Sequence, residues 1–244
     1  MSRPWCTCRR ARAAPLVIAI SGLDSRKEEN IERFGSFVER GIAALALDSP
    51  GTGQSGVNAA AGAERSISRV MDVVLARPEV DPKRVVLYGG SFGAHWATVL
   101  AVTERSRLSG VAAQSPLVHD AFLRERRDAL ETNREYLFDY VPAWMFAYGV
   151  DNMEDLLAAR ERMSLKTRGL LDHPMAPMLV IAGVRDTQVP IADFDLLMHS
   201  GETPKEAWIH PRGGHMGRDA AAWPDPVIFR RVTAPWLLRM LELP

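Results

Sequence analysis

The feature that most constrains the fold is a short apolar run that leads into a glycine-framed serine, VVLYGGSFGAHW at residues 85–96. The apolar residues favour a buried strand, and the small residues after Ser91 allow a helix to begin at once. A Cβ atom at Gly89 or Gly93 would collide where strand and helix close on each other, and glycine gives the clearance. The stretch predicts a strand, a tight turn with Ser91 at its apex, and a helix whose first amides point at whatever the serine meets.

The rest of the chain alternates short β-branched runs with helical stretches. This alternation is typical of an open, mostly parallel sheet of about six strands with helices on both faces. We expect strands at 15–20, 42–47, 84–89, 108–114, 177–182 and 205–210. At 244 residues and 47% hydrophobic content, the chain can bury one full core. We therefore expect a basic tail over residues 1–14 and one α/β domain over residues 15–244.

Three helices can be placed from their patterns. The first has a capping box at residues 25–28 and an apolar face at Ile31, Phe34, Phe37 and Val38. Two more are expected, at residues 64–76 and 226–241. The last is amphipathic, and its apolar side chains can pack on the sheet.

Residues 116–175 form an insertion far longer than an ordinary connection of an α/β fold needs. It is rich in aromatic residues, namely Phe122, Tyr136, Phe138, Tyr140, Trp144, Phe146 and Tyr148. Two interpretations stay open, and both can hold together. The insertion is either a helical decoration with its own small core, or a lid over Ser91 whose aromatic residues line an apolar substrate pocket.

Composition narrows the classes of partner and compartment. A formal net charge of zero gives no basic excess that would attract nucleic acid or anionic lipid. Cys6 and Cys8 are too few for a disulfide framework and lack the partners of a zinc site, which fits a reducing cytoplasm. The apolar run at residues 16–20 is too short for the core of an export signal. No segment reaches the ~20 apolar residues of a membrane span.

A nucleophilic serine needs a base in contact with it and an acid that orients the base. Serine hydrolases with this kind of strand–turn–helix carry the three residues in the order serine, acid, histidine. Asp186 follows the strand at residues 177–182, and His215 lies in a glycine-bearing loop after the strand at residues 205–210. The sequence therefore predicts Ser91, Asp186 and His215 as nucleophile, acid and base at one edge of the sheet, with no metal or organic cofactor required.

Attack on a carbonyl also needs two backbone amides to meet the oxyanion. We expect these at Phe92, directly after the nucleophile, and at Leu23, in the loop after the first strand. Substrate contacts are predicted for Asp24, His119, Trp144 and Tyr148. His95 lies one helical turn after Ser91, and we expect it to be structural.

The segment DSPGTGQS at residues 48–55 looks like a phosphate-binding loop. That motif needs a glycine first and a lysine before its final serine or threonine, because the lysine meets the β- and γ-phosphates. Asp48 and Gln54 stand at these places. We therefore interpret the segment as a tight turn at the edge of the sheet near the site, and not as part of an NTPase.

Four segments, at residues 21–29, 48–53, 89–93 and 213–217, resemble the α/β-hydrolase superfamily. Within it they look like the branch of fermentation/respiration-switch esterase-like proteins, which is similar to pseudooxynicotine hydrolase and to the fungal enzymes that shorten pigment polyketides. The resemblance covers roughly residues 15–240. It implies Ser91, Asp186 and His215 in the roles given above, Leu23 and Phe92 as oxyanion amides, and substrates that are esters or ketones cleaved at a carbon–carbon bond.

The chain departs from this family in two places. Ser21-Gly22 stands where the branch often has Gly-Gly before the leucine, which bears on the second oxyanion amide. Superfamily members usually begin with two further strands, and this branch with a helical domain as well, which the first fourteen residues cannot hold. The strand at residues 42–47 should then be an edge strand. A bare apolar edge invites pairing, so we expect a homodimer or a trimmed chain start.

Together these features predict a serine hydrolase that cleaves an ester of an apolar or aromatic small molecule through an acyl-enzyme. Two alternatives stay open. One is a carbon–carbon bond hydrolase of a diketone or aryl ketone. The other is a hydrolase-like protein without catalysis that binds or regulates.

Overall fold

The computed structural model describes residues 13–133, 135–136, 139–202 and 204–242. Cys6, Cys8, Phe138 and nearly all of the expected basic tail lie outside the described residues. None of the helices in the described part of the chain is long and apolar enough to cross a membrane.

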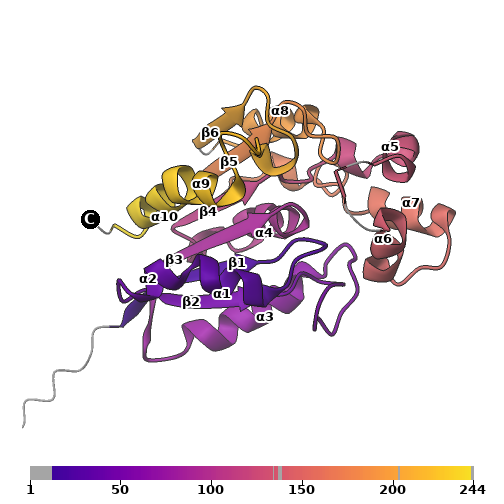
Figure 1. The fold of residues 1–244 in the computed structure, drawn as a ribbon. Helices are drawn as coiled ribbons and strands as arrows, with labels where there is room; N and C mark the ends of the chain where they lie inside the picture. The colour runs from indigo at the N-terminus through magenta and orange to yellow at the C-terminus, as the bar shows by residue number, and fades with distance from the viewer. Residues whose placement is uncertain (1–12, 134, 137–138, 203, 243–244) are drawn as a thin grey trace, which may run out of the picture.

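The six expected strands form one parallel sheet (Figure 1). They are β1 Ala14–Ile20, β2 Ala43–Leu47, β3 Val80–Gly90, β4 Gly110–Gln114, β5 Met178–Gly183 and β6 Lys205–His210. Their spatial order is β2-β1-β3-β4-β5-β6. The order makes β2 an edge strand, as expected, and it places the carboxyl ends of β3, β5 and β6 along one edge of the sheet.

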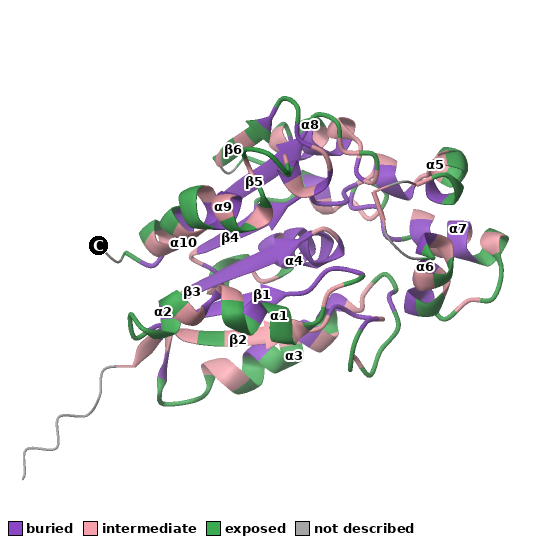
Figure 2. Cartoon of the chain, in the orientation of Figure 1, coloured by how far each residue is buried: buried purple, intermediate pink, exposed green. Residues whose placement is uncertain are grey.

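Helices cover both faces of the sheet, whose central strands are buried (Figure 2). Alternate residues of the strands belong to two separate cores. One face carries α3 Glu64–Leu75, α4 Phe92–Thr103 and α8 Ile191–Met198. The other carries α1 Lys27–Arg33, α2 Gly35–Val38, α9 Asp225–Ile228 and α10 Ala234–Met240. The predicted α/β architecture is thus confirmed.

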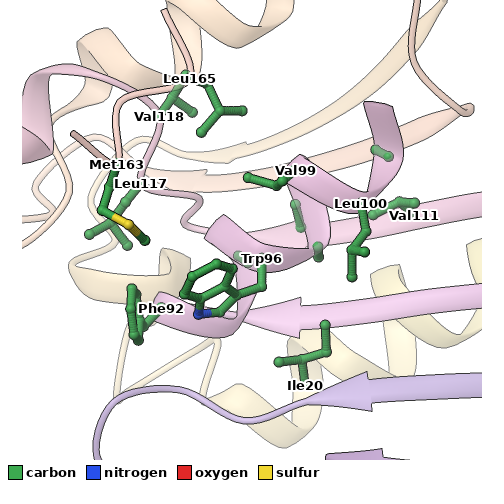
Figure 3. Packing of buried hydrophobic residues seen from close by; sticks show 14 of the residues in the cluster. Ile20, Phe92, Trp96, Val99, Leu100, Val111, Leu117, Val118, Met163 and Leu165 are labelled. Carbon is green, nitrogen blue, oxygen red and sulfur yellow. The ribbon is translucent and has the colours of Figure 1, made fainter. Parts of the chain in front are cut away.

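Helix α4 is buried almost all round, because it lies against the middle of the sheet and is covered by the chain beyond it. Trp96, Val99 and Leu100 pack there with Ile20 and Val111 from neighbouring strands (Figure 3). Such an apolar helix cannot shift without opening the core. The turn at its N-terminus therefore rests on a rigid support.

The first helix differs from the expectation. The Ser25 hydroxyl accepts a hydrogen bond from the Gly22 amide at 2.7 Å, so the capping box at residues 25–28 is wrong. Arg26 is the N-cap instead, Glu29 accepts its backbone amide at 2.8 Å, and α1 begins at Lys27, one residue later than expected. Its chain then breaks at Phe34 into two short helices. Because the helical phase is lost there, Ile31 and Val38 are 62% and 57% exposed, whereas the phenylalanines of the predicted face are buried.

The last expected helix packs on the sheet as predicted, but it is not continuous. Between α9 and α10 the residues Phe229–Thr233 form a π-helical turn. Phe229, Trp236 and Leu237 are buried against the sheet. The wider turn adds a residue to the helical path, which is the usual effect of a π-bulge.

The insertion at residues 116–175 contains α5 Arg127–Glu131, α6 Tyr140–Tyr148 and α7 Met153–Glu161, besides short 3-10 turns. Its buried side chains continue the core above α4: the rings of Phe92 and Trp144 lie 4.8 Å apart, centre to centre. Phe146 is 77% exposed and takes no part in this packing. The role of the insertion as a lid stays a prediction.

Candidate active site

Ser91 occupies the turn between β3 and α4 with a backbone conformation of φ 53° and ψ −120°. A Cβ atom added at Gly89 would lie 2.2 Å from the Gly93 carbonyl oxygen, and one added at Gly93 would lie 2.3 Å from that of Ile20. Both glycines are therefore required. Gly89 allows the close approach of strand and helix inferred from the sequence, whereas Gly93 allows α4 to approach the end of β1, which is outside the motif. A positive φ in a residue other than glycine costs about 1–3 kcal/mol and persists only where the surroundings impose it.

The Ser91 hydroxyl meets the His215 ring, which in turn meets the Asp186 carboxylate. Ser91 Oγ lies 2.8 Å from His215 Nε2, and His215 Nδ1 lies 2.9 and 3.1 Å from the two carboxylate oxygens of Asp186. The histidine and aspartate side chains are only 5% and 2% exposed. The three residues chosen from the sequence are brought together at the edge of the sheet.

Asp186 is held by the loop that follows β5. One carboxylate oxygen accepts the amides of Gln188 and Val189 at 2.9 and 2.8 Å, and the other accepts the Ser115 hydroxyl at 2.9 Å. Burial disfavours the charged form, but His215 and these hydrogen bonds outweigh it and hold the pKa of Asp186 below its usual value. The carboxylate is therefore ionised and accepts from Nδ1–H, which leaves Nε2 free to accept the serine proton.

Ser115 was not among the residues predicted from the sequence. It directly follows β4, has a positive φ of 53°, and its hydroxyl also accepts the Met216 amide at 2.9 Å. A polar residue at the carboxyl end of a strand beside the Ser91 strand was the available signal, because ligand sites of such sheets form at this edge.

A cavity of about 250 Å³ opens in front of Ser91 and His215. Of the residues predicted to contact substrate or oxyanion, Leu23, Asp24 and Trp144 line it. Phe92, His119 and Tyr148 do not. The His119 ring is 2.8 Å from the Ser164 hydroxyl, and Tyr148 is buried behind Trp144 with its ring centre 5.9 Å from that of the tryptophan.

The two amides expected to meet an oxyanion belong to Phe92, which directly follows Ser91, and to Leu23, which lines the cavity with Ser91. Phe92 is the first residue of α4, and the amides of a first helical turn have no intrahelical acceptor. Within the described residues, the Leu23 amide makes no hydrogen bond. These positions are compatible with the predicted role, which stays a prediction.

His95 is fully buried and does not line the cavity. Its Nδ1 lies 2.9 Å from the Leu117 carbonyl oxygen, and burial lowers its pKa to about 3. The ring is neutral near pH 7, so Nδ1–H donates to the carbonyl. These contacts agree with the structural role expected for this histidine.

One wall of the cavity is strongly polar, which differs from the apolar pocket expected. Arg33 donates to the Asp225 carboxylate at 2.6 Å and to the Tyr88 hydroxyl. The Tyr88 hydroxyl donates to Gln114 Oε1 at 2.9 Å, and Gln114 Nε2 donates to the Asp225 carboxylate at 3.0 Å. Four distant segments supply this network, so no local pattern in the sequence could reveal it. Arg218 lines the cavity as well.

The described residues hold no group of three or more histidine, cysteine or acidic side chains that could bind a metal ion. The chemistry offered by the cavity is that of a serine hydroxyl, an imidazole and a carboxylate in hydrogen-bonded sequence.

A parallel sheet with a positive-φ serine between strand and helix, and with acid and histidine on the loops beyond two later strands, defines an α/β-hydrolase fold. Solved structures agree. The chain is similar to 2,6-dihydroxy-pseudo-oxynicotine hydrolase, with a TM-score of 0.77 and 22% identity over 94% of this chain and 61% of that one. It is also similar to AbyA5, with a TM-score of 0.78 and 20% identity over 94% and 64% of the two chains. At such identities the likeness shows the fold alone.

A family model described as esterase FrsA-like matches residues 8–212, so the chain belongs to the FrsA-like esterase family. Esterase FrsA of Citrobacter koseri is 33% identical over 168 residues, which are 68% of this chain and 40% of the relative. Esterase FrsA of Yersinia pestis is 29% identical over 194 residues, which are 78% and 46% of the two. The chain thus spans less than half the length of these relatives. The family resemblance inferred from the motifs is confirmed.

Proposed function

We propose that this protein is a serine hydrolase that cleaves carboxylic esters through a covalent acyl-enzyme. The observation that carries the proposal is the hydrogen-bonded line from Ser91 through His215 to Asp186 at the floor of an open cavity. Membership of the FrsA-like esterase family supports the same reaction class.

In the acylation step, Ser91 Oγ attacks the ester carbonyl carbon while His215 Nε2 takes the hydroxyl proton. The carbonyl oxygen becomes an oxyanion, which the Leu23 and Phe92 amides stabilise; each such donor typically contributes ~10²–10³ in rate. The intermediate collapses, the ester C–O bond breaks, and His215 returns the proton to the departing alcohol. Water then attacks the acyl carbon while His215 Nε2 takes its proton. The bond between the acyl carbon and Ser91 Oγ breaks, His215 returns the proton to Oγ, and the carboxylic acid leaves.

Asp186 acts on this reaction through the histidine. Its ionised carboxylate fixes the Nδ1–H tautomer and stabilises the imidazolium that forms when Nε2 is protonated. Because the carboxylate is itself held by Ser115 and by two amides of its own loop, the ring is oriented before substrate arrives.

The cavity supports a small ester that carries both an apolar or aromatic part and a polar part. Trp144 and Tyr136 give it aromatic surface, in keeping with the expected substrate class. The wall formed by Arg33, Asp225 and Arg218 adds charged groups that can meet a polar part of the substrate.

A fluorophosphonate probe tests this proposal, because it phosphonylates only a serine that its own site activates. We expect the wild-type protein to be labelled, and mass spectrometry of the digest to place the label on Ser91. Absence of labelling would favour the non-catalytic alternative. A panel of ester and diketone substrates, read out by the products, separates ester from carbon–carbon cleavage.

A further inference from the structure

A carboxylate of the insertion reaches the loops that carry both the acid and the histidine of the site. Glu135 Oε1 accepts the backbone amide of His215 at 2.8 Å. Its other oxygen accepts the backbone amide of Thr187 at 2.7 Å and, in addition, the Thr187 hydroxyl. Thr187 directly follows Asp186 in the chain. The Glu135 side chain therefore connects Thr187, which follows the acid, with His215, which is the base.

The surrounding backbone leaves room for this approach. A Cβ atom at Gly214 would lie 2.2 Å from Glu135 Oε1, so a side chain next to His215 would displace the carboxylate. The backbone that carries Glu135 is also fixed, because Asn133 Oδ1 accepts the backbone amides of Glu135 and Tyr136 at 3.0 and 3.1 Å. The carboxylate is thus fixed from its own segment as well as by the groups it binds.

The two loops are also joined directly, by the Arg185 amide to the Gly213 carbonyl at 2.9 Å. The contact through Glu135 adds a connection on the side of the cavity, since Glu135 lines the cavity together with Ser91. A second residue of the insertion, Arg126, also contacts Thr187, because it donates a hydrogen bond to the Thr187 carbonyl at 3.3 Å. Displacement of the insertion would release both holds on Thr187.

We propose that Glu135 is a positioning residue that fixes the acid loop and the histidine loop relative to each other. It thereby makes a docked insertion a condition for the competent alignment of Ser91, His215 and Asp186. The inference rests on the proposed function, since it concerns the efficiency of that site. It assigns the insertion a part in catalysis beyond covering the cavity.

The chemistry of the bridge requires a carboxylate. Three donors converge on two oxygens, and a carboxylate accepts all of them. A glutamine keeps the size but turns one oxygen into an NH₂ group, which cannot accept from the backbone amide that it faces. Hydrogen bonds to an ionised acceptor are also roughly twice as strong as neutral ones. Glu135→Gln should therefore release one of the two loops with little change in volume.

The test compares Glu135→Gln with Glu131→Gln, a glutamate of the same insertion that, among the described residues, pairs only with Arg127 at 3.1 Å. For Glu135→Gln we expect kcat on a p-nitrophenyl ester to fall about 10- to 100-fold, the scale of a small misplacement of catalytic groups. KM should stay within about twofold, because the change acts on alignment and leaves ground-state binding intact. The rate of fluorophosphonate labelling should fall in proportion, and Glu131→Gln should match the wild type in each measurement.

Hydrogen exchange gives a readout that does not depend on turnover. The amides of Thr187 and His215 lose their acceptor in Glu135→Gln or become weakly bonded, so peptides covering residues 184–189 and 211–218 should exchange faster than in the control. A second variant, Thr187→Val, removes only the hydroxyl contact, and we expect a smaller loss of kcat. Adding Glu135→Gln to Thr187→Val should then lower kcat by a smaller factor than adding it to the wild type, because the two residues share one interaction.

A kcat for Glu135→Gln within twofold of the wild type, with unchanged exchange in both peptides, would overturn the inference. So would a rise in KM at constant kcat, which indicates a substrate contact. Failure of the proposed function looks different. In that case the wild-type protein itself neither turns over esters nor reacts with the fluorophosphonate.

Discussion

The Ser115 hydroxyl donates a hydrogen bond of 2.9 Å to the Asp186 carboxylate, although the two residues belong to different loops. The same hydroxyl oxygen accepts the amide of Met216, the residue after the proposed base. Ser115 thus connects the acid with the segment that carries the histidine. Its positive φ marks a strained backbone at the end of β4, which is a common property of residues that support a site.

Ser115→Ala should therefore weaken the site without blocking it. The variant removes one of the hydrogen bonds that stabilise the ionised form of Asp186, and it leaves the Met216 amide without an acceptor. We expect kcat/KM to fall about 3- to 30-fold and the free energy of unfolding to fall by about 1–3 kcal/mol, the usual cost of an unsatisfied buried group. Steady-state kinetics and urea denaturation measure the two effects, and an unchanged value of both would show that the contact is unimportant.

The close packing at the Ser91 turn predicts that replacing Gly93 by alanine affects stability very differently from replacing Gly35. A Cβ atom at Gly93 would meet backbone oxygens of Ile20 and Ser21 at 2.3 and 2.5 Å, whereas one at Gly35 has nothing within 4 Å. Gly93→Ala should destabilise the protein by more than about 2 kcal/mol, a size typical of overpacking in a core. Gly35→Ala, in a helix, should be neutral or stabilising by up to about 1 kcal/mol. Equal melting temperatures of the two variants would contradict the close approach of α4 and β1.

His95 makes stability depend on pH. Burial lowers its pKa to about 3, while an unfolded histidine titrates near 6.5. Between these values the unfolded chain binds a proton that the folded chain does not, so stability falls as pH drops through this window. One such group changes the free energy of unfolding by up to about 1.4 kcal/mol per pH unit.

His95→Asn keeps a donor for the Leu117 carbonyl and removes the titration. We expect its unfolding free energy to depend less steeply on pH between about 4 and 6 than that of the wild type. Chemical denaturation across this range measures the slope. The absolute stability of the variant is not the readout, because the smaller side chain leaves a cavity. Parallel pH profiles for the two proteins would show that His95 titrates normally in the fold.

The edge strand β2 bears on the oligomeric state. It pairs only with β1 in the described sheet, and its apolar residues are partly exposed. An open edge of this kind presents unpaired amides and carbonyls to a second chain, which is why the sequence predicts a homodimer. Light scattering after size-exclusion chromatography should give twice the mass of 27.0 kDa if β2 pairs across a dimer, whereas a single chain mass at micromolar concentration would reject this arrangement.

Much of the sheet could be predicted because strand signals are local. Apolar runs that end in turn residues place five of the six strands within about two residues. The start of β3 is earlier than expected because Val80 pairs with Ala14 across an irregularity in the ladder, which no local pattern encodes. The capping box was misplaced by one residue, because Glu29 and not Glu28 accepts the backbone amide of the N-cap residue Arg26, while the Ser25 hydroxyl accepts the Gly22 amide within its own turn.

The proposed catalytic residues were accessible from sequence because parallel strands bring their carboxyl ends to one edge, so order along the chain becomes position in space. Substrate contacts were not accessible in this way. His119 bonds Ser164 and Tyr148 packs behind Trp144 because long-range packing orients the insertion. Glu135 sits in a segment without strong periodicity, and nothing local indicates that its carboxylate reaches His215.

The most direct test of the account is the turnover of a short p-nitrophenyl ester by the wild type and by Ser91→Ala. Among the described residues, the Ser91 side chain makes a hydrogen bond only with His215, so its removal should leave the fold and the cavity intact. We predict measurable turnover by the wild type and a loss of at least about 10³-fold in kcat for the variant, as expected when a nucleophile of such a triad is removed. Equal turnover by the two proteins would contradict the assignment of Ser91 as the nucleophile.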